Sequence, residues 1–256
     1  MNRPDRVILS KGSYLHGMNT TSHFLVGLGV VSSAVAPSCA FNGGVKGTGP
    51  VVHRTVTLEP IKGFVLEGSM EVQLSRSATQ DIDIEAQENI AALITTEVRD
   101  GIWHISTSKS YSTSAPFIIH IDVPSIEVVK VDGSGDVIGN GEFEQDRAMF
   151  DVSGSGSITL AMFAERIDAR IDGSGDVRLT GQCDLLDVKV HGSGDVSASD
   201  LELTDLNAMI DGSGNITANA SGKVDARISG SGDVVLLRQP TDIAQHVDGS
   251  GAVRVK

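Results

Sequence analysis

The sequence predicts an all-β fold in which residues 51–256 form a single-domain parallel β-helix, a solenoid with coils of about 19 residues. First, a Gly-Ser-Gly phrase occurs seven times, at steps of 21, 19, 19, 20, 18 and 19 residues. A period that survives small insertions indicates stacked repeats. Second, β-branched residues flank every copy, as Val131 and Val137 flank the first. Third, aromatic residues make up only 4% of the chain, which suits a narrow aliphatic interior.

The phrase itself is predicted to form the corner at which each coil turns. Glycine adopts a positive φ without steric cost, whereas a β-branched residue does not. Serine hydroxyls stacked about 4.8 Å apart can bond to neighbouring backbone groups. Side chains two positions apart share one face of a strand, so the β-branched columns beside the corner should form buried ladders. The predicted corner residues are Gly133, Gly135, Gly154, Gly156, Gly173, Gly175, Gly192, Gly194, Gly212, Gly214, Gly230, Gly232, Gly249 and Gly251.

Residues 131–256 carry the regular copies, whereas residues 51–130 are predicted to form irregular coils of the same domain. The segment 63–74 matches the phrase with Met70 in place of a glycine, so the repeat begins well before the clean copies. Alternating or β-branched runs that end at turn residues predict further strands. These strands cover residues 52–58, 81–85, 102–106 and 117–123.

One short helix is expected in the N-terminal half, over residues 88–98. Its apolar residues recur with the i, i+3, i+4, i+8 spacing of one helix face, and Asn89 is available as the N-cap. The dipeptide Asp100-Gly101 that follows is a hairpin signal. We therefore expect a helix and then an antiparallel hairpin.

Residues 1–40 have the pattern of a signal peptide: a basic start, an apolar segment over residues 24–36 and small residues before a cleavage point after Ala40. The apolar segment is too short for a membrane span, which needs about 20 residues. Lipidation at Cys39 and a start at Met18 rather than Met1 stay open as alternatives. Residues 41–50, with four glycines, are predicted to be a flexible leader. We expect export to the periplasm, the outer membrane surface or the exterior, with no transmembrane segment in the mature chain.

The net charge of −13 excludes nucleic acid and anionic lipid as expected partners, because such partners need clustered Lys and Arg. If the signal peptide is removed, Cys183 is the one cysteine left, and it cannot form an internal disulfide. We expect Cys183 to be a small buried hydrophobic residue. The seven histidines are scattered without a metal-binding spacing, so no metal site is expected.

The acidic residues beside the corner glycines argue against a calcium ladder, although DGSGD is similar to calcium-binding loops. The residue before the first glycine alternates strictly between acidic and non-acidic from Asp132 to Asp248. The column after the second glycine contains one adjacent acidic pair. Because like charges one rung apart repel, this order limits repulsion without a metal. We expect these side chains to cap turns, and we expect no cofactor.

A carbohydrate-active enzyme, either a polysaccharide lyase or hydrolase-like, stays open as an alternative. A lyase needs Arg or Lys beside clustered acids in one groove, and the nearest candidates are Arg166, Arg170 and Arg178 with Asp172 and Asp176. A catalytic pair should appear once, whereas acids recur at most of the corners. We therefore expect no catalytic residue.

The ordered combination of motifs resembles a known family. The copies read VDGSGDV, SGSGSI, IDGSGDV, HGSGDV, DGSGNI, SGSGDV and DGSGAV, preceded by GF at 63–64, ENI at 88–90 and TEVRDG at 96–101. Over about residues 50–256 this is similar to the putative autotransporter adhesin head GIN domain family of bacterial envelope proteins (DUF2807). The resemblance implies a right-handed parallel β-helix shaped like pectin lyases but without their catalytic residues. It also implies an adhesive role, and it supplies no binding residues.

Together these observations predict a non-enzymatic exported protein of the cell envelope, whose solenoid offers a long rigid surface for adhesion. The expected partner is a surface protein or a glycan. An envelope sensor or scaffold protein is a further alternative, and the sequence leaves the oligomeric state open.

Overall fold

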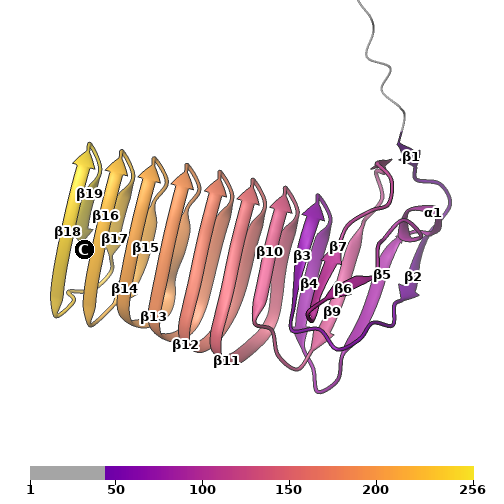
Figure 1. The fold of residues 1–256 in the computed structure, drawn as a ribbon, viewed down its shortest axis with the longest axis horizontal. Coiled ribbons are helices and arrows are strands. Elements are labelled where there is room, and N and C mark those ends of the chain that lie inside the picture. Colours follow the sequence, from indigo (N-terminus) through magenta and orange to yellow (C-terminus); the bar gives the residue numbers. More distant parts are fainter. Residues whose placement is uncertain (1–43) are drawn as a thin grey trace, which may run out of the picture. The chain divides into compact units, whose positions relative to one another are not determined.

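The computed structural model describes residues 44–256, which form a β-solenoid of about seven turns with coils of roughly 19 residues (Figure 1). This confirms the predicted fold class. The regular strands are β10 (Val128–Gly133), β11 (Asp136–Gly154), β12 (Ser157–Gly173), β13 (Asp176–Gly192), β14 (Val196–Gly212), β15 (Ile216–Ala220), β16 (Lys223–Gly230), β17 (Asp233–Leu236), β18 (Asp242–Gly249) and β19 (Ala252–Val255). All of them pair in parallel with the strands of the neighbouring coils.

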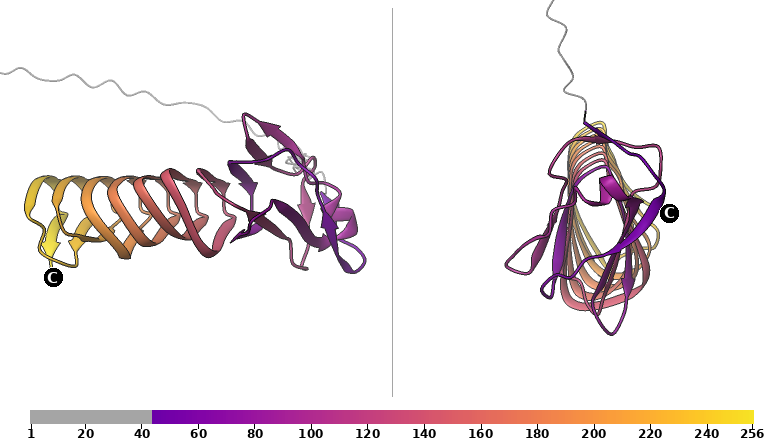
Figure 2. Two further views of the ribbon diagram at one scale, coloured as in Figure 1. Left: turned by 90° about the horizontal axis from the view of Figure 1, so that it is seen from below. Right: turned by 90° about the vertical axis from the view of Figure 1, so that its right-hand side faces the viewer.

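Each coil is flattened, and the successive coils superimpose when they are viewed along the long axis (Figure 2). The outer surface of the segments that lead into the Gly-Ser-Gly corner is here called the first face. The outer surface of the segments that leave the corner is called the second face. The chain returns from the second face to the first through a bend midway between successive corners. The register places Gly154 beside Gly133 on one side and Gly173 on the other.

The two β-branched columns beside the corner form the predicted core. Val131, Val152 and their equivalents are at most 2% exposed in six of the seven copies, and so are Val137 and its equivalents. Burial of each such side chain contributes about 1.5–3 kcal/mol. In the last copy Val247 is 37% exposed, because β18 pairs with β16 on one side only.

The corner needs glycine for two different reasons. The first glycine of every regular copy has φ between +125° and +138°, as Gly154 and Gly212 show. A Cβ on the second glycine, Gly156, would overlap the carbonyl oxygen of Gly135 one coil earlier. The prediction that the serine hydroxyl makes the hydrogen bond at the corner is wrong, because the backbone N–H of the serine makes it instead. Ser155 N donates to Gly133 O at 2.8 Å, and no corner serine of the regular copies uses its hydroxyl in a hydrogen bond within residues 44–256.

The repeat begins in the N-terminal half, as residues 63–74 predict. The strands β3 (Gly63–Gly68) and β4 (Glu71–Arg76) stack on β10 and β11, with Gly68 beside Gly133 and Glu71 beside Asp136. In Figure 1 the end of β3 is in line with the ends of β10 and β11. The strands β7 (Ile102–Ile105) and β9 (Ile118–Val123) come later in the sequence, but they stack on the other side of β3 and β4, away from β10 and β11.

Antiparallel strands complete the N-terminal end of the described chain. They are β2 (Val51–Thr55), which pairs with β5 (Asp81–Gln87), and β6 (Glu97–Arg99), which pairs with β7. The hairpin between β6 and β7 turns at Asp100 and Gly101, both with positive φ, as the sequence predicts. A short pair, β1 (Val45–Lys46) with β8 (Tyr111–Ser112), lies partly in the segment expected to be a flexible leader.

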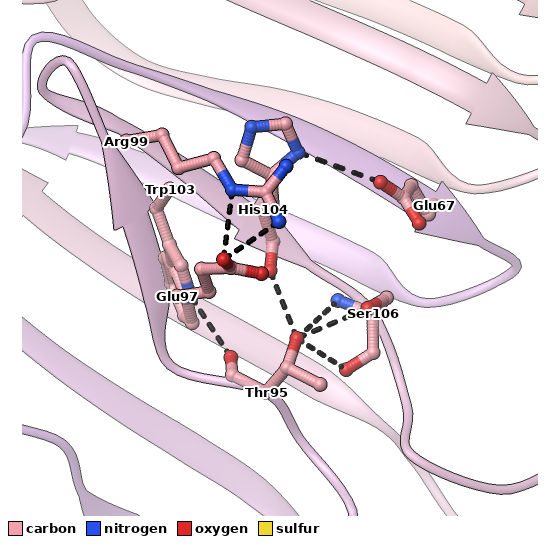
Figure 3. A network of polar contacts seen from close by, with 7 residues as sticks. All are labelled: Glu67, Thr95, Glu97, Arg99, Trp103, His104 and Ser106. Atoms are coloured by element: carbon pink, nitrogen blue, oxygen red, sulfur yellow. Dashed lines mark hydrogen bonds and ion pairs between the residues drawn. The ribbon is translucent and has the colours of Figure 1, made fainter.

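The helix α1 (Glu88–Ala91) is much shorter than the predicted helix over residues 88–98. The prediction of an Asn89 cap is wrong: Gln87 is the N-cap, and the Asn89 side chain bonds to Thr48 N and Lys46 O instead. The helix ends early because the residues from Thr95 onward make contacts with β7 instead of helical hydrogen bonds. The hydroxyl of Thr95 donates to the carbonyl oxygen of His104 at 2.9 Å, and the following residues enter β6 (Figure 3).

The same contacts anchor the one tryptophan of the chain. Trp103 is fully buried, and its Nε1–H donates to Thr95 O at 2.9 Å (Figure 3). Along β6, Arg99 pairs with Glu97, and on β7 His104 lies 3.5 Å from a carboxylate oxygen of Glu67 on β3. This network joins the hairpin to the next coil.

The predicted signal peptide, the Cys39 lipidation alternative and the choice of start codon fall outside the described residues. Across residues 44–256, no helix combines the length and the apolar character that crossing a membrane requires.

A candidate binding groove at the bend of the coils

The acidic column after the second corner glycine acts as a backbone cap. This corner row consists of Asp136, Ser157, Asp176, Asp195, Asn215, Asp233 and Ala252. Asp195 N donates to Asp176 Oδ1 at 3.1 Å, and Asn215 N donates to Asp195 Oδ1 at 2.7 Å. The same contact repeats from Ala252 N to Asp233. The prediction that the acids beside the corner act as caps is confirmed for Asp176, Asp195 and Asp233. It is wrong for the column before the first glycine, where Asp172 binds Arg170 instead. Among residues 44–256, no group of three or more His, Cys, Asp or Glu is arranged to hold a metal ion.

The arginines considered for a lyase site are not brought together. Arg166 and Arg170 lie on the first face, where each binds the aspartate two residues later, at 2.9 Å and 2.7 Å. Arg178 follows the corner and pairs with Asp200 at 2.8 Å. The Arg170 guanidinium lowers the pKa of Asp172, which keeps that carboxylate ionised and bound. Arg170 lines a groove on the first face with Lys130, Lys189 and several aspartates, but its guanidinium is bound to Asp172.

Cys183 has no reactive role in this structure. Its side chain is 1% exposed, and its Sγ–H donates to the carbonyl oxygen of Leu185 at 3.1 Å. Burial raises the pKa of the thiol to about 11, so the thiolate is scarce at neutral pH. Cys183 is therefore the buried hydrophobic residue that the sequence predicts.

The bend opposite the corner carries a groove of about 620 Å³, here called the bend groove. It spans β11, β12 and β13, where glycines with positive φ, Gly141 and Gly181, help the chain to turn. The register of β11 against β12 also shifts between Ile138 and Glu142, which lets the first bend bulge. The groove is lined by Arg76, Glu144, Gln145, Asp146, Phe163, Ala164, Glu165, Gln182 and Asp184.

Three carboxylates stand in line along this groove, one per coil. This bend row consists of Asp146, Glu165 and Asp184, each eight residues before the first glycine of its copy. Neighbouring coils are about 4.8 Å apart. Within the part of the chain that the structure describes, none of the three carboxylates has an ion-pair partner or accepts a hydrogen bond. The bend row therefore concentrates negative charge that its own surroundings do not neutralise.

The groove also contains an exposed aromatic ring and side-chain amides. Phe163 is 37% exposed and lies in register between Glu144 and Gln182 of the neighbouring coils. The Nε2 of Gln145 is buried and has no hydrogen-bond partner. A buried donor without a partner is rare in native proteins and costs about 1–3 kcal/mol. An aromatic ring, several carboxylates and amide groups together can hold a ligand by stacking and by polar contacts.

The sequence prediction missed this groove. The signal was present, because the position eight before the first glycine is acidic in three consecutive copies. The sequence does not show that these acids lack partners, or that Phe163 points outward at the bend, since the bend has no fixed motif.

Comparison with solved structures agrees with the fold. A crystal structure described as a putative adhesin from Bacteroides fragilis has 23% identity and a TM-score of 0.79, covering 83% of this chain and 100% of that chain. A putative adhesin from Parabacteroides distasonis has 19% identity and a TM-score of 0.69, with 83% and 99% covered. A protein from the same species, described as a putative lipid binding protein, has 21% identity, a TM-score of 0.69 and the same coverage. At these identities the likeness shows the fold.

No curated protein matches the chain. The family described as putative auto-transporter adhesin, head GIN domain, matches residues 62–240. This match covers the imperfect copy at residues 63–74 and six of the seven regular copies. Because it spans well over half of the sequence, the protein belongs to the putative auto-transporter adhesin, head GIN domain family.

Proposed function

We propose that the protein is a non-enzymatic adhesin of the cell envelope that binds a surface partner through the bend groove. The observation that carries the proposal is the exposure of Phe163 beside three carboxylates in line that have no partner in the described chain. Elsewhere on the coils, Asp176, Asp195 and Asp233 bond to backbone N–H groups, and Arg166 and Arg170 bind neighbouring carboxylates. The bend groove brings unpaired carboxylates and an exposed aromatic ring together in one place.

The rigid scaffold suits a binding role. Parallel pairing runs continuously through the regular coils, and the core columns are nearly fully buried, so the lining of the groove is held on strands rather than on loops. A site built on strands is already organised for its partner, which lowers the entropic cost of binding.

The non-enzymatic part of the proposal is supported by the distribution of charge. Asp172 lies before the corner and Asp176 after it, and Asp176 accepts the N–H of Asp195. The arginines considered for a lyase are paired on two different faces. A lyase would need a free base beside the acids in one groove.

Export is supported by the signal-peptide pattern of residues 1–40. We propose that the mature protein lies in the periplasm, at the outer membrane surface or outside the cell. Cell fractionation with an antibody to the chain tests this: recovery of the full-length chain in the cytosol alone would contradict export.

Binding is tested with the fluorescently labelled protein on intact bacterial and host cells. We expect saturable binding that falls at least tenfold in Phe163→Ser. The control is Met149→Ser, because Met149 is also an exposed apolar residue, 42% exposed, but lies outside the groove. Equal binding by both variants would refute the groove, and turnover of a polyuronate that is lost in Asp172→Asn would refute the non-enzymatic assignment.

A further inference from the structure

We infer that the bend groove binds an extended basic segment of a partner protein, with Lys or Arg residues three positions apart. This inference rests on the proposed binding function and names the chemistry of its partner. Four carboxylates line the groove, those of the bend row and Glu144, against the single basic residue Arg76. Arg76 lies at one end, where its Nη1 donates to the carbonyl oxygen of Glu142 at 3.2 Å.

The bend row differs from two other acidic rows of the solenoid in having no partner for its carboxylates. On the first face, Asp168 and Asp172 are each bound by an arginine. In the corner row, Asp176 and Asp195 each accept a backbone N–H from the next coil. In the bend row, neither a basic side chain of the described chain nor a backbone N–H binds the carboxylates. Three like charges at successive rungs repel one another, and a bound cation would relieve this repulsion.

The spacing of the row favours a peptide over a single ion. Asp146 and Asp184 are two coils apart, which is about 9.6 Å at 4.8 Å per coil. A polyproline II segment rises about 3.1 Å per residue with three residues per turn, so residues i and i+3 lie on the same side about 9.3 Å apart. Two basic residues at this spacing reach both ends of the bend row.

The remaining groups of the groove fit the same partner. The ring of Phe163 lies in the row next to the bend row, where it can contact the aliphatic stem or the cationic head of a bound side chain. The groove thus offers a basic extended peptide both unpaired carboxylates and an aromatic face.

The test uses the full chain and the synthetic peptide acetyl-Lys-Pro-Ser-Lys-Pro-Ser-Lys-amide in isothermal titration calorimetry. We expect binding that weakens when the salt concentration is raised from 50 to 300 mM, because the contacts are ionic. The variant Asp146→Asn/Asp184→Asn should bind at least tenfold more weakly. The control Asp132→Asn/Asp211→Asn removes the same charge from exposed carboxylates outside the groove and should change the affinity less than twofold.

Further arms separate this inference from the proposed function. A peptide with Gln in place of Lys should not bind, and neither should Ca²⁺ alone or a neutral oligosaccharide of N-acetylglucosamine. If the oligosaccharide binds and the groove variant abolishes it, the basic partner is wrong while the adhesive function stands. If Asp146→Asn/Asp184→Asn and Asp132→Asn/Asp211→Asn bind the peptide equally well, the inference is refuted. If the peptide binds in the groove but the protein adheres to no cell, the inference stands and the proposed function fails.

Discussion

The carboxylate of Asp195 accepts hydrogen bonds from both the backbone N–H and the side-chain Nδ2 of Asn215, at 2.7 Å and 2.9 Å. The two residues occupy the same position in successive coils. Asn215 in turn accepts the N–H of Asp233 through its own Oδ1 at 3.1 Å. From Asp176 to Asp233 the corner row is therefore a chain of side-chain caps in which each residue binds the backbone at the start of the next coil.

Removing one link of this chain should destabilise the solenoid modestly. Asp195→Ala leaves the N–H and the Nδ2 of Asn215 without this acceptor, and it should lower the free energy of unfolding by about 1–2 kcal/mol. Asp195→Asn retains an oxygen acceptor and should cost less. Urea unfolding followed by circular dichroism measures both values. The control is Asp211→Ala, which removes an exposed aspartate that has no hydrogen bond or ion pair in the described chain. An equal loss in all three variants would contradict the capping role.

Alanine at a corner glycine should have a much larger effect. Gly154 has φ +125°, and a Cβ there would overlap the carbonyl oxygen of Gly133, so Gly154→Ala should cost about 2–4 kcal/mol. The matched control is Gly68→Ala at the first corner. Gly68 has a similar φ of +133°, but the nearest atoms to its Cβ belong to the flexible side chain of Met70, at 3.6 Å. Gly68→Ala should cost about 1–2 kcal/mol.

The difference between these two variants isolates the steric contribution from the backbone strain. Thermal and urea unfolding of both variants provides it. If Gly68→Ala proves as costly as Gly154→Ala, the close approach of successive corners is not what requires glycine.

The repeat could be predicted from the sequence because its cause is local and periodic. A glycine with positive φ and a β-branched residue two positions earlier recur at each turn, so the columns around Val131 and Gly133 identify both the core and the corner. The imperfect copy at residues 63–74 was also recognisable, although Met70 replaces its second glycine. A Cβ is tolerated there because no regular Gly-Ser-Gly corner precedes it in the stack.

The helix end and the bend groove could not be predicted, because both depend on contacts that are distant in the sequence. The spacing after Ile90 is helical, but the hydroxyl of Thr95 bonds to β7 and the next residues pair in the hairpin. At the bend, the acidic column is visible in the aligned copies. That Asp146 and Asp184 lack partners follows from the path of three coils around the groove, which no single copy contains.

The buried thiol gives a chemical test of the core. In a Cys39→Ser background, Cys183 should not react with a thiol reagent such as dithionitrobenzoate at pH 8, since burial raises its pKa to about 11. It should react promptly in 8 M urea. Rapid reaction of the native protein would show that the interior near Leu203, its partner in the next coil, opens readily.

The contact between β2 and β5 should respond to pH through His53. Its Nδ1 lies 2.6 Å from Asp83 Oδ2, and this hydrogen bond raises the pKa of the imidazole above 6.5, with a smaller contribution from Glu85. A raised folded-state pKa means that the interaction stabilises the folded protein below pH 6.5 and is lost as the pH rises through the folded pKa. His120 stacks on His53 with ring centroids 6.3 Å apart and contacts Glu85, so both carboxylates face an imidazole.

Titration of the imidazole chemical shifts by NMR should give a midpoint above 6.5 for His53, and Asp83→Asn should return it towards 6.5. The difference in urea midpoint between the wild type and Asp83→Asn should be largest below pH 6.5 and should shrink as the pH rises to 8. The control is Asp81→Asn, which lies on the same strand without contact to either imidazole. A difference that grows with pH instead would mean that Asp83 stabilises β2 through a partner other than the imidazolium.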